Sequence, residues 1–124
     1  MRRLWQAGGC LLVAAAAMAA SLVERVPSGA AKTLNPLEGS DPARRAGAKL
    51  YARECAACHG QNREGIGKAP PLNQSEVHAA PPGVLFWILR NGSLRRGMPS
   101  FAHLPEAERW QIIAFLQGED GGGM

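Results

Sequence analysis

The chain has 124 residues, enough for one folded domain and little more. Aromatic residues are scarce (6%) and glycine and proline are abundant (15 and 9 residues), which predicts short helices, long loops and a thin apolar core that needs a disulfide, a metal or a cofactor. The net charge of +4 falls to +2 without Arg2, Arg3, Glu24 and Arg25, and no basic stripe with interleaved aromatic residues is present, so nucleic acid is excluded as a partner.

An apolar, alanine-rich stretch follows the basic start Met1-Arg2-Arg3 and continues to Val23. We predict that residues 1–23 are a signal peptide or a membrane anchor, because small residues suit cleavage and the stretch has about the 20 residues that span a bilayer. Either outcome places the rest of the chain in the periplasm, soluble after signal cleavage or anchored to the inner membrane. Cleavage would also remove Cys10 and leave Cys55 and Cys58 as a pair.

Residues 24–40 carry proline, glycine, serine and asparagine without periodicity, so we predict a linker there. The folded domain is predicted over residues 41–118. It begins with a helix for which Asp41 is the expected N-cap and Pro42 lies in the first turn. Apolar residues at helical spacing carry this helix to the alanine-rich cysteine pair.

Three further segments complete the predicted domain. Residues 60–72 are rich in glycine and proline and are expected to form a loop. Residues 82–90 form an apolar run that we interpret as a short buried helix, with a strand as the alternative. Residues 105–117 are the last predicted helix, with acidic side chains in the first turn where the helix dipole favours them. Residues 119–124 are expected to be a flexible tail.

The segment Cys55-Ala56-Ala57-Cys58-His59 has the form C-x-x-C-H, the signature of covalent haem attachment. Two thiols three positions apart on a helical turn can each add across one vinyl group of the same porphyrin. The adjacent histidine then lies under the ring and offers an imidazole nitrogen to the iron. A disulfide or redox dithiol is the alternative, but the βαβ context of a thioredoxin-like site is absent. A zinc site lacks a second pair of ligands.

Met98 is the candidate for the second axial position on the iron, because it lies in a loop between Gly97 and Pro99. The alternative is that Met98 only packs on the core. His78 and His103 are rival ligands, although a lone histidine in a polar loop is usually solvated. Ligation by His59 and Met98 would raise the reduction potential and saturate the iron, which suits electron transfer rather than oxygen chemistry.

In their order and spacing these residues resemble a class I cytochrome c, a family that includes small bacterial single-haem proteins, over about residues 35–116. The resemblance implies a small all-α cytochrome c fold of three to four short helices wrapped around one covalently bound haem c. The residues that carry it are Gly47, Tyr51, Cys55, Cys58, His59, Pro70, Leu72, Gly97, Met98, Pro99, Ile112 and Phe115.

The resemblance also implies individual roles. Gly47 and Tyr51 would meet Ile112 and Phe115 where the first and last helices cross. The carbonyl of Pro70 would accept a hydrogen bond from the distal ring nitrogen of His59 and fix the orientation of the imidazole. The apolar residues expected around the haem are Leu72, Leu85, Trp87 and Phe101.

These features predict a single-electron carrier and not an enzyme, because no substrate pocket, general base or nucleophile is evident. The expected partners are redox proteins: a periplasmic dehydrogenase, a membrane respiratory complex or an oxidase. A dedicated cytochrome subunit of a dehydrogenase complex is one alternative, and a haem sensor or enzyme with an open iron site is another. Arg90, Arg95 and Arg96 flank the Met98 loop and form either a solvated surface or a docking patch for an acidic redox partner.

Overall fold

The computed structural model describes residues 26–119, so the predictions for residues 1–23 and for the tail after Glu119 lie outside the described residues. The described part is helical and contains no strand. Its elements are η1 (Ser28–Lys32), α2 (Asp41–Glu54), α3 (Ala56–His59), α4 (Ser75–Ala79), α5 (Pro82–Asn91), η2 (Leu94–Arg96) and α6 (Glu106–Gln117). The predicted all-α class is confirmed. The described residues form five α-helices, whereas three to four were expected. Two of the five, α3 and α4, are very short, with 4 and 5 residues.

Helix α2 begins where the sequence predicts a helix, but its cap differs from the prediction. The N-cap is Ser40, whose side chain accepts a hydrogen bond from the backbone N–H of Ala43 at 3.2 Å. The assignment of Asp41 as the cap is therefore wrong. Asp41 is the first helical residue, and its carboxylate pairs with Arg44 one turn later at 3.0 Å.

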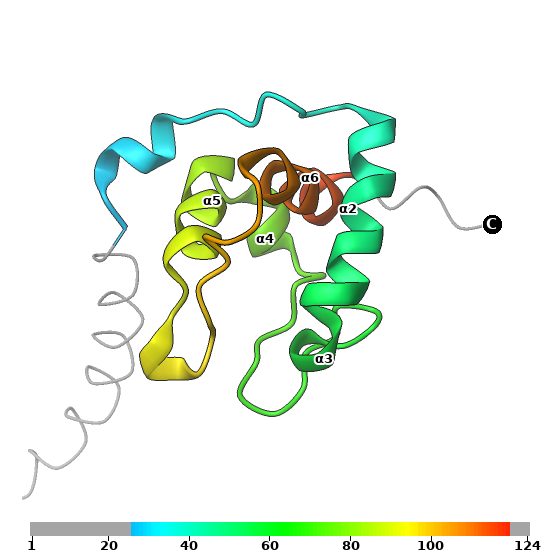
Figure 1. Ribbon diagram of the computed structural model, residues 1–124, viewed down its shortest axis with the longest axis vertical. Helices are drawn as coiled ribbons and strands as arrows, with labels where there is room; N and C mark the ends of the chain where they lie inside the picture. The colour runs from blue at the N-terminus through cyan, green and yellow to red at the C-terminus, as the bar shows by residue number, and fades with distance from the viewer. Residues whose placement is uncertain (1–25, 120–124) are drawn as a thin grey trace, which may run out of the picture.

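Helices α2 and α6 cross closely, as the resemblance predicts (Figure 1). Gly47 makes the crossing possible, because a Cβ at this position would collide with the carbonyl of Gln111 and reach within 2.9 Å of the Phe115 Cβ. One turn further along α2, the Tyr51 ring meets the Phe115 ring with their centroids 5.5 Å apart. A side chain at residue 47 would therefore force the two helices apart.

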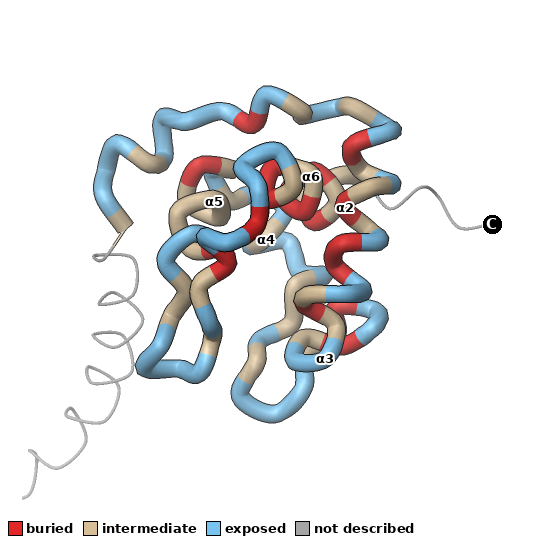
Figure 2. The backbone as a smooth tube through the Cα atoms, in the orientation of Figure 1, coloured by how far each residue is buried: buried red, intermediate tan, exposed pale blue. Residues whose placement is uncertain are grey.

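The apolar core lies between α2, α5 and α6 (Figure 2). Tyr51, Ile112 and Ile113 are its largest fully buried side chains. On α5, Phe86 stacks on Trp110 of α6 with ring centroids 4.0 Å apart. The predicted helix over residues 82–90 is confirmed, as is the last helix, and none of the helices within residues 26–119 is long and apolar enough to cross a membrane.

Residues 26–40, which fall in the predicted linker, run along one side of the domain from α5 to the start of α2 (Figure 1). Gly83 of α5 lies so close to η1 that an added Cβ would collide with the carbonyl of Ala30. The buried side chain of Asn35 donates from Nδ2 to the carbonyl of Trp110 at 3.1 Å. The composition of this segment did not reveal these contacts, which attach it to both α5 and α6.

Candidate functional site

The cysteine pair lies on a tight turn that follows α2. The helix ends at Glu54, and Cys55 (φ −119°, ψ −32°) leads directly into the single turn α3. The carbonyl of Cys55 accepts hydrogen bonds from the N–H groups of Cys58 and His59 at 3.2 and 2.9 Å. The two cysteines are not joined in a disulfide, and Cys55 is buried whereas Cys58 is exposed. The turn therefore holds two thiols and an imidazole together on one short segment, although α2 itself does not continue through it.

The imidazole of His59 is oriented by the loop that follows it. Its Nδ1 lies 2.8 Å from the carbonyl oxygen of Pro70. A carbonyl oxygen can only accept, so the proton of this hydrogen bond belongs to Nδ1, and Nε2 keeps a lone pair. The hydrogen bond implied by the resemblance is thus present, and it prepares Nε2 to act as a metal ligand.

Hydrogen bonds between backbone groups hold the predicted loop over residues 60–72 in shape. The N–H of Gly65 donates to the carbonyl of His59 at 2.7 Å, and the N–H of Leu72 donates to the carbonyl of Arg63 at 2.8 Å. The buried hydroxyl of Tyr51 donates to the carbonyl of Gly60 at 2.7 Å and joins the loop to α2. Gly60 and Gly65 adopt φ of 90° and 83°, which only glycine adopts without strain. These bonds bring Pro70 back to His59.

The buried thiol of Cys55 is poorly suited to thiolate chemistry. Burial, together with the charges of Glu54 and Cys58, raises its pKa to about 11. The thiol is therefore protonated near neutral pH, whereas a redox dithiol uses a thiolate of lowered pKa. Within residues 26–119 no three His, Cys, Asp or Glu side chains gather as a metal site would require.

Met98 lies at the base of a closed loop. Its backbone exchanges two hydrogen bonds with Ser93, N–H to carbonyl in each direction, at 2.9 and 3.1 Å. The loop is joined to α5 by the N–H of Phe101, which donates to the carbonyl of Leu89 at 2.8 Å. The Met98 side chain is half-buried and packs against the core. Figure 1 shows the Met98 loop and the loop after His59 extending from the same end of the domain.

The apolar residues expected near a haem are distributed over three segments. Leu72, Leu85 and Trp87 are half-buried, and Phe101 is buried. All five apolar side chains from Val84 to Ile88 remain only half-buried, although α5 is apolar on every side. A helix of that composition is normally enclosed by the core. The donor atoms and this incompletely covered apolar surface fit a flat, largely apolar group such as haem.

The rival histidines lie at the surface of the domain. His78 and His103 are both exposed, His78 in α4 and His103 in the loop before α6. The ring of His103 lies near Phe101, with a centroid separation of 6.0 Å.

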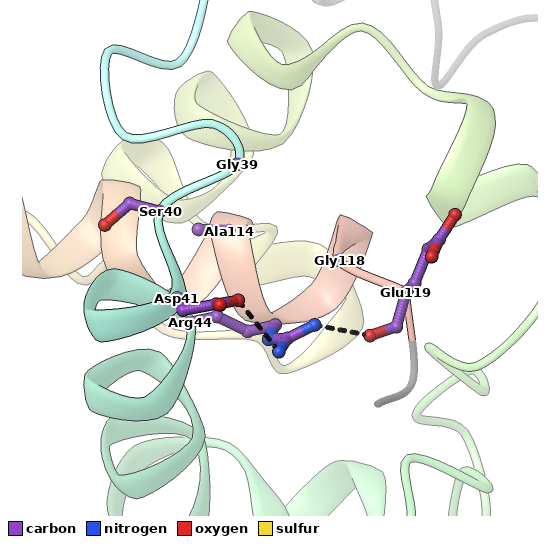
Figure 3. A pocket seen from close by; sticks show the side chains of 7 residues that line it. All are labelled: Gly39, Ser40, Asp41, Arg44, Ala114, Gly118 and Glu119. Atoms are coloured by element: carbon purple, nitrogen blue, oxygen red, sulfur yellow. Dashed lines mark hydrogen bonds and ion pairs between the residues drawn. The ribbon is translucent and has the colours of Figure 1, made fainter. Parts of the chain in front are cut away.

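A small cavity at the N-terminal end of α2 is unrelated to these residues (Figure 3). It lies at the opposite end of α2 from the cysteine pair, and Arg44 spans it, paired with Asp41 and donating to the carbonyl of Glu119 at 2.8 Å. Its lining residues are Gly39, Ser40, Asp41, Arg44, Ala114, Gly118 and Glu119. None of them is a predicted site residue.

One residue beside the site was missed by the sequence analysis. Arg63 is buried in the loop after His59, with φ of 60° and its guanidinium 4.9 Å from the centroid of the Phe115 ring. An arginine in a polar loop gives no local signal of burial. The only hint was its position in the chain between His59 and Pro70, which the family resemblance brings together.

Comparison with known proteins assigns the domain. Residues 42–116, more than half of the chain, match the family described as cytochrome C oxidase, cbb3-type, subunit III. The solved structure of cytochrome CL from the marine methylotrophic bacterium Methylophaga aminisulfidivorans MPT is similar, with a TM-score of 0.56 and 27% identity over 65% of this chain. The match covers 55% of that protein. No curated protein matches. The chain therefore belongs to this family of class I-like c-type cytochromes, which bind haem c covalently and use it for electron transfer.

Proposed function

We propose that this protein is a single-electron carrier of the periplasm, soluble or anchored to the inner membrane, in which Cys55 and Cys58 hold the haem and His59 and Met98 ligate its iron. The observation that carries the proposal is the 2.8 Å hydrogen bond between His59 Nδ1 and the Pro70 carbonyl, next to two cysteine side chains on the same turn. Bound in this way, the haem supplies a one-electron couple. The side chains of the protein orient the haem and form its surroundings.

Each of these residues has a separate task. The two thiols fix the cofactor to the chain, so the small core does not have to enclose it fully. Pro70 keeps the proton on Nδ1 of His59 and makes Nε2 a better donor. The thioether of Met98 is a soft, uncharged ligand that favours the reduced state of the iron and leaves no position open for oxygen.

Replacing Met98 tests the ligand assignment. We expect Met98→Ala to abolish the iron–sulfur charge-transfer absorption and to lower the reduction potential by on the order of 0.1–0.3 V, a part of the ~0.8 V range that axial ligands set. Potentiometric titration with absorption spectroscopy measures both. The matched controls are His78→Ala and His103→Ala, which should change neither. A native ferric protein that is already high-spin would instead indicate an open iron site, and a loss of the band in either histidine variant would refute Met98 as the ligand.

A second candidate function has one specific observation in its favour. The description of the matched family names a subunit of a cbb3-type cytochrome c oxidase, which supports a cytochrome bound permanently to one enzyme complex. A bound subunit co-purifies with its complex in mild detergent, whereas a carrier is recovered alone. Gel filtration of the solubilised protein, followed by its haem absorption, distinguishes the two.

A further inference from the structure

The N-terminal segment, which we define as residues 26–40, is packed on the domain. Gly83 of α5 lies so close to it that an added Cβ would come within 2.8 Å of the Thr33 carbonyl oxygen. The buried side chain of Asn35 donates to the carbonyl of Trp110 on α6, and its Oδ1 accepts a second backbone hydrogen bond at 2.8 Å. The segment is therefore held at both α5 and α6, which a flexible linker would not be.

This packing determines where the domain is joined to the chain that precedes it. Figure 1 shows η1 beside α5, with the start of α2 on the opposite side of the domain. Only Glu24 and Arg25 separate the N-terminal segment from the apolar stretch that ends at Val23. The chain from Val23 to Val26 reaches at most about 11 Å at full extension. Where residues 1–23 act as a membrane anchor, the α5 side of the domain is thus kept next to the bilayer.

The outer face of the N-terminal segment carries groups that suit a lipid surface. Lys32 and Leu34 are both exposed, Leu34 to 73%. From Arg25 to Leu37 the chain carries two cations and no acidic residue, and none of the ion pairs within residues 26–119 involves Lys32. A cation next to an apolar side chain fits the boundary between lipid headgroups and acyl chains, where the cation attracts anionic headgroups. Figure 2 shows the segment exposed along most of its length, so this face is open to such a contact.

The loops of the proposed haem site lie away from this face. In Figure 1 the chain between η1 and α2 crosses one end of the domain, and the loop after His59 and the Met98 loop extend from the other end. A domain that rests on a bilayer through the N-terminal segment therefore turns these two loops toward the aqueous phase.

We propose that the N-terminal segment is a membrane-contact surface that holds the haem domain in one orientation on a bilayer containing anionic lipid. This inference rests on the proposed function in its anchored form, and it adds that redox partners reach the haem from the aqueous side. Lys32 pairs with a headgroup phosphate, and Leu34 inserts between the headgroups. The packing of Asn35 and Gly83 then fixes the rest of the domain relative to this contact.

Electron paramagnetic resonance of the ferric haem tests the proposal, with the full-length, haem-loaded protein in stacked, oriented bilayers that contain phosphatidylglycerol. The spectrum of ferric haem is anisotropic, so a fixed orientation makes it change as the stack is turned in the magnetic field. We expect the wild type to show this angular dependence. Lys32→Glu/Leu34→Ser should lose most of it, because both lipid contacts are removed. The matched control is Ile66→Ser/Lys68→Glu, in which an exposed apolar residue and a cation with the same spacing are changed in the loop after His59, and it should keep the angular dependence.

Two insertions test whether packing holds the domain in place. A flexible Gly-Ser linker of about six residues between Arg25 and Val26 frees the packed domain from the anchor, and most of the angular dependence should be lost. The same linker between Gly39 and Ser40 should leave the dependence in place, because the contacts of Asn35 and Gly83 still join the segment to the domain. All variants should keep the absorption spectrum and reduction potential of the wild type, which separates a change of orientation from a change at the iron.

Several results would overturn the proposal. Angular dependence that survives in Lys32→Glu/Leu34→Ser would remove the lipid contact, and an equal loss from both insertions would remove the role of packing. A wild type without angular dependence in bilayers of lipid alone would leave a membrane protein as the occupant of this surface. Recovery of the protein from the periplasm without residues 1–23 would overturn the proposal while the carrier function stands. A protein without a reversible one-electron couple would instead overturn the proposed function.

Discussion

At the scale of single residues, the site depends on two hydrogen bonds that hold the loop after His59 in place. One joins His59 to Pro70, and the other joins the Tyr51 hydroxyl to the carbonyl of Gly60. The second is buried between α2 and the loop, where an unpaired carbonyl costs about 1–3 kcal/mol. Tyr51 therefore supports the imidazole indirectly, by fixing the residue that follows it.

Tyr51 makes the stability of the domain sensitive to alkaline pH. Burial is the main cause that raises its pKa from 10.0 to about 12. The folded state thus keeps a proton that the unfolded chain loses, so the contribution of Tyr51 to the free energy of unfolding is complete below about pH 10 and is lost between about pH 10 and 12. We expect a loss of about 2–3 kcal/mol over this interval, measured by urea denaturation at successive pH values.

The matched variant for this prediction is Tyr51→Phe. It should be less stable than the wild type by about 1–2 kcal/mol at neutral pH and should lack the part of the alkaline slope that belongs to Tyr51. Because Tyr51 is the only tyrosine of the chain, its ionisation can also be followed by ultraviolet absorption. A midpoint near pH 10 in the folded protein would contradict the buried hydrogen bond.

The roles of some of these residues could be predicted from the sequence, and those of others could not. Cys55, Cys58 and His59 form a contiguous motif whose chemistry can be inferred without a fold, and their assignment to the haem stays a prediction. The contact of Pro70 with His59 could be predicted only through the family resemblance, because Pro70 lies 11 positions further along the chain. The buried arginines Arg63 and Arg109 could not be predicted, because each is held over an aromatic ring by tertiary packing.

At the scale of elements, the contact between η1 and α5 attaches a segment that lies outside the matched family region to the core of the domain. Gly83→Ala places a methyl group against the backbone carbonyl of Ala30, which cannot move without displacing the segment. We expect the free energy of unfolding to fall by about 1–3 kcal/mol, the usual cost of overpacking. Denaturant unfolding of the haem-loaded protein measures it.

Gly29 provides the control for this substitution, since a Cβ added there meets no atom within 4 Å. Gly29→Ala should leave the free energy of unfolding within about 0.5 kcal/mol of the wild type. Equal stabilities of the two variants would mean that residues 26–40 do not pack on α5.

The helices with a long apolar pattern were predicted from the sequence, and those with a short one were missed. Residues 82–90 and 105–117 carry enough apolar residues and end signals to define α5 and α6. The five residues of α4 are too few to show a period, and α4 is held instead by the side chain of Gln117, which donates to the carbonyl of Val77 at 2.9 Å. The packed segment before α2 has no local pattern either, because its contacts are made by single residues such as Asn35.

At the scale of the whole molecule, we propose that the domain folds around its covalently bound haem. Two loops extend from one end of the domain, one directly after His59 and one containing Met98, and α5 keeps a half-buried apolar surface. The all-α class and the covalently bound haem c were both predictable, because the C-x-x-C-H motif and the residues around it carry the family resemblance that implies them. The arrangement of the loops could not be predicted from the sequence, because tertiary contacts determine it.

The central claim is that one haem is joined covalently to Cys55 and Cys58. Mass spectrometry of the protein from cells competent in haem attachment, intact and after proteolysis, tests it most directly. We predict a mass increased by one haem, located on a single fragment that contains residues 55–59 and unchanged by denaturation in acid and organic solvent. A fragment with two free thiols, or with the two sulfurs joined to each other, would contradict the claim.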